Sequence, residues 1–227
     1  MELRGPQIPD VDTLTRSALA AARDGEYYSE LLFDECHRER LVLERVTFAA
    51  VVFENPDIRN ARGEALHVED AHVDGGDLAN AAFAELALTR VCGRRIRATG
   101  LQLHGGKLRH VRLDRCRLDL ALFQDARLAS CRFEACDFRE ADFRGTEMED
   151  VQFARCDLRG ARFFGGRFRG LDLRGSQITG LEVDGPALKG ATVDPTQLID
   201  VARIHGVRVA PVESSPQESE PDASAGS

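Results

Sequence analysis

Three of the six cysteines are spaced so that their thiols could act together. Cys116, Cys136 and Cys156 follow one another at intervals of twenty residues, whereas the remaining three are Cys36, Cys92 and Cys131. Thiolates bind zinc and other soft metals, but zinc sites usually contain a CxxC pair or a nearby histidine, and this sequence has neither. The alternatives are a soft-metal ladder and a set of reduced cysteines that serve as small hydrophobic side chains. We expect the second, with no metal and no cofactor.

The other titratable side chains form no recognisable catalytic pattern. No Ser–His–Asp or Cys–His arrangement can be argued, and no glycine-rich loop joins an expected strand to an expected helix. Asp137 and Asp157 could form a carboxylate pair, but Arg139 and Arg159 accompany them, which favours an exposed ladder of ion pairs. No two histidines are twenty residues apart among His37, His67, His72, His104, His110 and His205. We predict that the protein is not an enzyme.

A five-residue period determines where these side chains lie. Every fifth residue from Leu43 to Leu198 gives 32 positions, and 29 of them carry a large apolar side chain. At the 43% apolar background of this sequence, about 14 would be expected. The exceptions are Gly63, Gly93 and Ala98. A second, smaller apolar side chain, often Ala, Val or Cys, stands two positions before most of them.

A period of five fits neither a helix nor a continuous strand. It fits a chain that turns a corner every five residues, so that four sides make a twenty-residue coil and stacked coils bury a shared column. The cysteines spaced by twenty then stack inside this column. Glycines recur at the corner position from Gly145 to Gly190, as is typical of turns. Packing is expected to be thinnest where Gly93 and Ala98 adjoin.

Several five-residue blocks resemble a known family. Residues 141–145 (Ala-Asp-Phe-Arg-Gly), 156–160 (Cys-Asp-Leu-Arg-Gly) and 171–175 (Leu-Asp-Leu-Arg-Gly) are similar to the A(D/N)LxX repeat of pentapeptide-repeat proteins. The resemblance implies an all-β solenoid, a right-handed quadrilateral β-helix of about eight coils over 43–198. At roughly 4.8 Å per rung, this rod would be roughly 38 Å long.

The ends of an open solenoid require caps, because they expose apolar rungs and unpaired backbone groups. At the N-terminus we expect a cap over 1–42, with a short helix over Asp10–Arg23 and a first partial coil. Asp194, Pro195 and Gln197 predict the start of a C-terminal helix over 194–210, with Gly206 near its end. The last segment, 211–227, is rich in Ser, Pro and acidic residues and predicts a disordered acidic tail.

The C-terminal helix has two possible roles. In quinolone-resistance members of the resembled family, such a helix carries the dimer contact, whereas in a monomer it would merely cover the last coil. Its candidate dimer residues are Leu198, Val201, Ala202, Ile204 and Val207.

The net charge of −8 is unevenly distributed. Residues 1–90 carry −9 and the tail −4, whereas the repeat region 43–198 is almost neutral at −1. A basic belt over 91–117 carries +7 and could be a solvated surface or a patch for an acidic partner; it contains Arg94, Arg95, Arg97, Lys107, Arg109, Arg112, Arg115 and Arg117. A candidate partner-binding acidic face contains Glu64, Glu69, Asp70, Asp74 and Asp77.

Two functions remain open. The first is an interaction scaffold for another protein, whose identity the sequence does not give. The second, implied by the resemblance, is an interaction with DNA gyrase or topoisomerase IV that confers fluoroquinolone resistance by DNA mimicry. Duplex DNA has about one charge per 1.7 Å, or roughly 22 over such a rod, so a net charge of −1 does not support mimicry along the whole rod.

Membrane and secretory segments are not evident. No run of about 18 apolar residues exists, and the first thirty residues lack a basic segment followed by an apolar one. We therefore expect a cytoplasmic protein that binds neither membranes nor nucleic acid directly.

Overall fold

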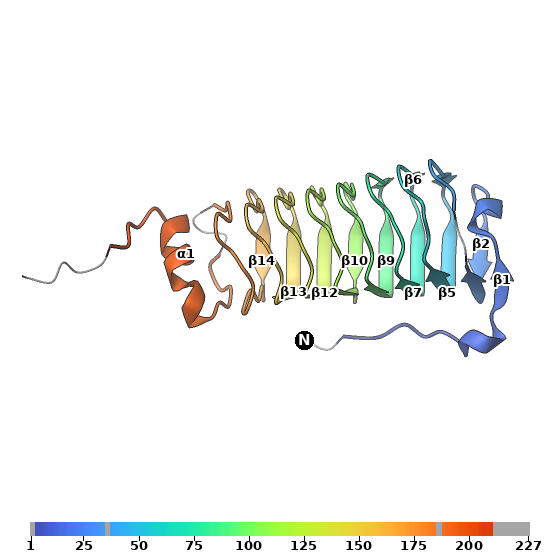
Figure 1. The fold of residues 1–227 in the computed structure, drawn as a ribbon, viewed down its shortest axis with the longest axis horizontal. Helices are drawn as coiled ribbons and strands as arrows, with labels where there is room; N and C mark the ends of the chain where they lie inside the picture. The colour runs from blue at the N-terminus through green and yellow to red at the C-terminus, as the bar shows by residue number, and fades with distance from the viewer. Residues whose placement is uncertain (1–2, 35–36, 185–187, 211–227) are drawn as a thin grey trace, which may run out of the picture.

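The chain folds into a straight stack of coils that forms a rod (Figure 1). The computed structural model describes residues 3–34, 37–184 and 188–210; Cys36 and the predicted tail 211–227 lie outside these ranges. Successive coils pair in parallel, which gives a parallel β-solenoid of about eight turns and confirms the expected architecture. The four sides of a coil are called A to D after their inward residues: A contains Phe48 and Val68, B contains Phe53 and Val73, C contains Ile58 and Leu78, and D contains Leu43 and Gly63.

The longest sheet covers sides A and B. Its eight-residue strands are β5 (Thr47–Glu54), β7 (His67–Asp74), β9 (Ala87–Arg94), β12 (Arg127–Glu134) and β13 (Glu147–Ala154). Its three-residue strands are β1 (Thr15–Ser17), β2 (Tyr27–Ser29), β3 (Leu31–Phe33), β10 (Lys107–Arg109), β11 (Arg112–Asp114) and β14 (Arg167–Arg169). A smaller sheet on side D contains β4 (Val42–Glu44), β6 (Arg62–Glu64) and β8 (Ala82–Ala84).

The register of the coils is twenty residues. Tyr27 pairs with Thr47 at the start, and the same offset continues to the bridge between Asp172 and Thr192. The regular register thus begins ahead of Leu43. At the other end Leu198 leaves the column, because it begins the C-terminal helix and is exposed.

The corners require a left-handed backbone. Residues between the sides have positive φ, such as 51° at Ala50 and 60° at Leu120. This region is unfavourable for β-branched residues, and the described non-glycine residues with positive φ include no Val, Ile or Thr. In the later coils glycine takes this place, with φ of 67° at Gly145 and 68° at Gly160, which confirms the predicted turn role.

A single apolar column occupies the interior of the rod. It forms one cluster of buried side chains from Leu19 to Leu181. Phenylalanine rings stack along its C-terminal half, with centroid distances of 4.8 Å from Phe143 to both Phe123 and Phe163. The predicted five-residue column is therefore the core of the molecule.

The predicted N-terminal helix is wrong. Over Asp10–Arg23 the chain forms two short 3-10 turns, η1 (Val11–Thr13) and η2 (Leu19–Ala21), separated by strand β1. Parallel pairing of Thr15 with Leu31 uses the backbone groups that a helix would have needed internally. Leu19, which was expected on the apolar face of the helix, is buried in the core cluster instead.

The segment before η1 runs back along the outside of the rod (Figure 1). Ile8 packs on a separate apolar cluster of Leu14, Leu32 and Val52. The backbone N–H of Gln7 donates to Asp70 Oδ1 at 2.8 Å. Gln7 and Ile8 are thus held on the outer surface of the rod and do not belong to the internal column.

The predicted C-terminal helix is confirmed, in a shorter form. A 3-10 turn, η3 (Pro195–Gln197), leads into α1 (Leu198–Ile204). Asp194 is the N-cap, and the reciprocal hydrogen bonds between Asp194 and Gln197 make the expected capping box. Gly206 has a φ of 72° and donates to Arg203 O, while Val207 N donates to Ala202 O. These two bonds form a Schellman motif, which ends the helix.

Candidate functional site

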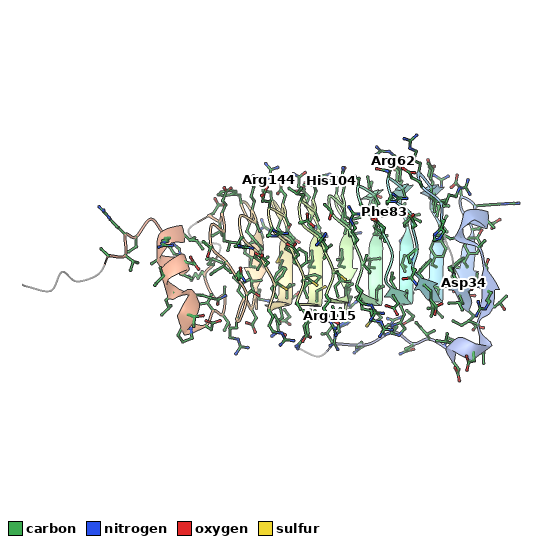
Figure 2. The ribbon with its side chains drawn as sticks, in the orientation of Figure 1. Asp34, Arg62, Phe83, His104, Arg115 and Arg144 are labelled. Atoms are coloured by element: carbon green, nitrogen blue, oxygen red, sulfur yellow. The ribbon has the colours of Figure 1, made fainter. Side chains whose placement is uncertain are left out.

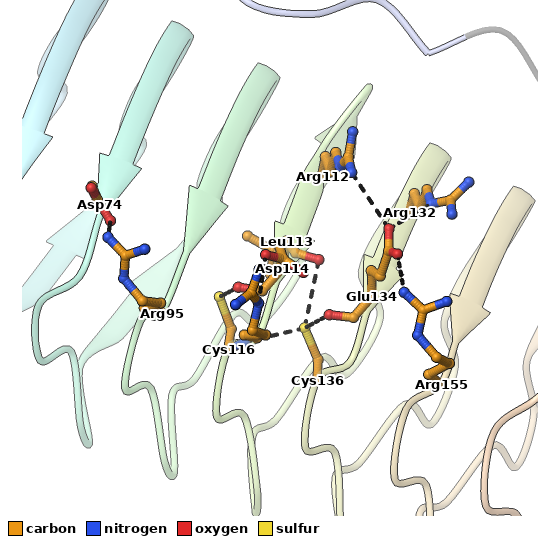
Figure 3. A network of polar contacts seen from close by, with 11 residues as sticks. Asp74, Arg95, Arg112, Leu113, Asp114, Cys116, Arg132, Glu134, Cys136 and Arg155 are labelled. Atoms are coloured by element: carbon orange, nitrogen blue, oxygen red, sulfur yellow. Dashed lines mark hydrogen bonds and ion pairs between the residues drawn. The ribbon is translucent and has the colours of Figure 1, made fainter.

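The stacked cysteines form hydrogen bonds with backbone groups at one corner of the column, as Figure 3 shows for Cys116 and Cys136. Cys136 Sγ donates to Leu113 O at 3.6 Å, and Cys156 Sγ donates to Phe133 O at 3.4 Å. Cys116 N donates to Cys136 Sγ at 3.4 Å. The sulfurs therefore occupy hydrogen-bonding positions between one coil and the next.

Hydroxyl side chains make the same bond elsewhere in the column. Thr146 Oγ1 donates to Phe123 O, and Ser176 Oγ donates to Phe153 O, each at 3.0 Å. In every case the acceptor lies 23 residues before the donor, as it does for Cys136 and Cys156. Cysteine, serine and threonine thus play the same structural part, namely a side-chain donor to a backbone carbonyl of the preceding coil at a buried corner.

Three of the buried thiols, those of Cys116, Cys131 and Cys156, are poor nucleophiles. Burial raises the pKa of Cys131 to about 12. A hydrogen bond with Cys136, together with burial, raises the pKa of Cys116 and of Cys156 well above the usual range. Since the thiolate is the reactive form, the arrangement supports the structural role that the sequence favoured. No group of three metal-ligating side chains occurs among the described residues.

Cys92 and His72 make a second cysteine environment, which the sequence did not single out. They are direct partners on β9 and β7, and both point outward from side B. Burial raises the pKa of Cys92 and lowers that of His72. Both groups are therefore favoured in their neutral forms, so this pair lacks the ion-pair character of an activated thiol.

The expected ladder of aspartate–arginine pairs is present. Arg139 Nη2 contacts Asp137 Oδ2 at 2.7 Å, and Arg159 Nη2 contacts Asp157 Oδ2 at 2.6 Å. Hydrogen bonds from Arg159 hold the pKa of Asp157 below its usual value. These carboxylates stay ionised at neutral pH and are bound to their own arginines, which leaves no free carboxylate pair for acid–base chemistry.

One member of this series, Asp142, is buried, and its sequence position gave no indication of this. Its side chain is only 3% exposed and bonds Arg144 Nη2 at 2.6 Å and Gln124 Nε2 at 3.0 Å. Burial raises the pKa of Asp142, but the hydrogen bonds from Arg144 and Gln124 outweigh it and the pKa lies below its usual value. The pair is a structural bond on side D, near the edge where Arg144 projects (Figure 2).

The five acidic residues proposed as a face do not lie together. Glu64 is on β6 at side D, whereas Glu69 and Asp70 are on β7 at side A. Asp74 follows on side B, and Asp77 bridges to Arg97 on side C. The sequence interval from Glu64 to Asp77 is most of one coil, so these carboxylates point in all four directions.

Arg90 and three arginines of the basic belt neutralise four of these five acids. Arg90 binds both Glu69 and Asp70, and its hydrogen bond lowers the pKa of Asp70. The other contacts, partly visible in Figure 3, are Arg94 and Arg95 with Asp74, and Arg97 with Asp77. Each of these arginines lies about one coil after its acid. Acidic and basic segments that are separate in sequence are thus interleaved in space.

The belt also pairs with acids that follow it. Glu134 receives Arg112 at 3.4 Å and Arg132 at 3.2 Å, and it also contacts Arg155 (Figure 3). Among the described residues, Lys107, Arg109 and Arg117 form no ion pair. Arg117 is on side C, whereas the other two are on β10 at side A, so a concentrated cationic patch is not formed.

The C-terminal helix divides its apolar residues between the column and the surface. Of the predicted dimer residues, Val201 and Ile204 pack against the core cluster, and Ala202 is half-buried. Leu198 and Val207 are 58% and 54% exposed, and Ile199, which was not among the predicted set, is 51% exposed. The helix therefore packs Val201 and Ile204 against the core cluster and leaves the apolar side chains of Leu198 and Ile199 exposed.

Residues 107–183 match a family described as the pentapeptide repeat region, and no curated protein matches the chain significantly. A trypsin-treated form of QnrB1, a plasmid-mediated fluoroquinolone resistance protein, aligns with 18% identity over 86% of this chain and 100% of that chain, with a TM-score of 0.39. HetL, a pentapeptide repeat protein involved in heterocyst differentiation regulation from the cyanobacterium Nostoc sp. strain PCC 7120, aligns with 15% identity over 78% and 84%, with a TM-score of 0.38. In the described part of the chain, no helix is long and apolar enough to cross a membrane.

Proposed function

We propose that this chain, whose residues 107–183 match the pentapeptide repeat region, acts as a non-enzymatic interaction scaffold for another protein. The outward positions of each coil are separate from the buried column, so they can carry a binding surface without affecting the fold. The titratable groups support this proposal. The buried thiols form coil-to-coil hydrogen bonds, and most of the carboxylates described above bind arginine.

The observation that carries the proposal is a group of exposed apolar side chains at the C-terminal end. Leu198, Ile199, Val207 and Val209 are all about half exposed within one short segment. The flanks of the rod have isolated exposed apolar residues, such as Val42 and Leu120, but these lie on different coils. Exposed apolar residues that gather in one segment are typical of a protein contact, and we propose that two copies of this chain associate through this segment.

Ile199→Asp tests this contact. We expect wild-type protein to sediment as a dimer and Ile199→Asp to sediment as a monomer, because a charge would replace an apolar side chain in the interface. The matched control is Val42→Asp, which introduces the same charge at an exposed apolar residue on side D and should leave the dimer intact. A monomeric wild type, or an Ile199→Asp dimer of unchanged affinity, would remove the dimer proposal.

The topoisomerase interaction is the second candidate. It requires a surface that resembles the phosphate backbone of DNA, with closely spaced uncompensated negative charge. Asp70, Asp74 and Asp77 instead lie on three different sides and bind arginines of the next coil. The scaffold therefore ranks above DNA mimicry.

A further inference from the structure

The N-terminal half of the rod contains a long internal cavity. Its volume is about 180 Å³, and its lining extends from Leu19 at the N-terminal cap to Phe123. Side chains from all four sides of the coils contribute to the wall, including Val68 on side A, Val73 on side B and Leu78 on side C. The cavity therefore follows the axis of the column and is not a groove on the surface.

The sequence explains why the cavity lies in this half. In the C-terminal half the column is filled by phenylalanine rings in mutual contact, among them Phe133, Phe143 and Phe153. The lining between Phe53 and Phe123 has one aromatic residue, Phe83. Three positions of the column in this region carry no large side chain at all, namely Gly63, Gly93 and Ala98.

Exposure of the inward side chains shows the same difference. Phe143 and Leu158 in the later coils are 0% exposed. Inward residues that line the cavity are only partly buried although they point away from the outer surface; they include Ile58, Val68, Val73, Leu78, Phe83 and Leu88. These side chains are not in full contact with one another, which leaves room for a guest molecule.

The chemistry of the cavity wall determines which kind of ligand the cavity can bind. The surface that the cavity exposes is apolar throughout, and a water molecule requires two to four polar partners to remain in such a space. Engineered cavities of about 150 Å³ with apolar walls stay dry and bind benzene or xenon. We propose that this cavity binds small, uncharged, apolar molecules, of about the size of benzene or a short alkyl chain.

Ala98 gives the sharpest variant with which to test the site. It is 2% exposed and lines the cavity, and it lies between Leu78 and Leu118 at the same position of the neighbouring coils. Ala98→Leu therefore fills the cavity with a side chain that the adjacent coils already accommodate. The matched control is Ala84→Leu, which adds the same atoms at an exposed position on side D.

Binding is measured with xenon and with benzene on the full-length chain. We expect ¹²⁹Xe chemical-shift titration to show saturable binding, and benzene to raise the melting temperature of wild-type protein and of Ala84→Leu. Both effects should be lost in Ala98→Leu, which should melt at a higher temperature than wild type without benzene, because the added side chain fills empty space. Val73→Leu, a smaller change in the same wall, should weaken xenon binding and covers the case in which Ala98→Leu does not fold. Absence of saturable xenon binding to the wild type, or equal binding to wild type and the filled variants, would overturn the proposal.

Discussion

Replacing Phe143 with alanine is expected to lower the free energy of unfolding by about 3–5 kcal/mol. Phe143 is 0% exposed, and its ring lies 4.8 Å from those of Phe123 and Phe163 and 5.8 Å from that of Phe153. Truncation removes the contacts with rings in the coils on both sides. Because close packing leaves little freedom to collapse around the gap, most of the lost contact should appear as lost stability. Urea denaturation monitored by circular dichroism measures the change.

A charged substitution at the same position should lower the stability further. Phe143→Asp would bury an unpaired carboxylate, which costs several kcal/mol beyond the lost packing, so we expect this variant to be unfolded or insoluble. The matched control is Arg167→Ala, whose side chain is 87% exposed and should change stability by less than about 0.5 kcal/mol. Arg144 is unsuitable as a control because it pairs with the buried Asp142. Similar midpoints for Phe143→Ala and Arg167→Ala would contradict the assigned column.

Gln197→Leu is expected to destabilise the C-terminal end of the rod. The Gln197 side chain is buried, and its Nε2 donates to Leu173 O and Ser176 O at 2.7 Å each. Leucine preserves most of the volume but leaves Ser176 O unpaired, at a cost of about 1–3 kcal/mol, and it removes one of the two donors to Leu173 O, which still accepts from Ser176 N. It also removes the Oε1 acceptor for Asp194 N, at 2.9 Å, and with it half of the capping box.

Hydrogen–deuterium exchange locates this effect. In a solenoid each coil contacts only its neighbours, so amides near Leu173 should exchange faster in Gln197→Leu while those near Phe123 change little. Thr196→Ala is the control, because its exposed hydroxyl caps only Asp194 and makes no bond to the last coil. Unchanged exchange near Leu173, or acceleration of equal size along the whole rod, would show that Gln197 does not fasten the helix to the column.

The fold could be predicted because its main determinant is periodic. A large apolar residue at every fifth position fixes which side chains face inward, whatever the outward residues are. The C-terminal cap was predictable from Asp194, Pro195 and Gln197, which satisfy local backbone groups. The N-terminal helix was wrong because its backbone groups pair with β3, a distant partner that local spacing cannot reveal.

The pairing of charged side chains was not predicted from the sequence. Summed over segments, the sequence has an acidic N-terminal part and a basic belt, but the ion pairs connect residues twenty positions apart, such as Asp70 with Arg90 and Asp77 with Arg97. A comparison of each acidic residue with the residue twenty positions later in the sequence would have revealed these ion pairs. The burial of Asp142 depends on how neighbouring side chains cover it, and no interval in the sequence encodes that.

Gly93 and Ala98 allowed a prediction that was correct only in part. Their small side chains correctly predicted thin packing in the middle coils, and both line the cavity. Its extent, from Leu19 to Phe123, could not be inferred, because it depends on the combined volume of side chains from all four sides. Periodicity gives the direction in which a side chain points but not how well the interior is filled.

A gyrase supercoiling assay tests most directly whether this rod is a charge-compensated scaffold or a DNA mimic. Purified full-length protein is added well above the enzyme concentration, with and without a fluoroquinolone. Because its carboxylates are distributed over four sides and largely paired with arginine, we expect no inhibition of supercoiling and no rescue from the drug. Inhibition of supercoiling, or protection against the fluoroquinolone, would contradict the scaffold and favour mimicry.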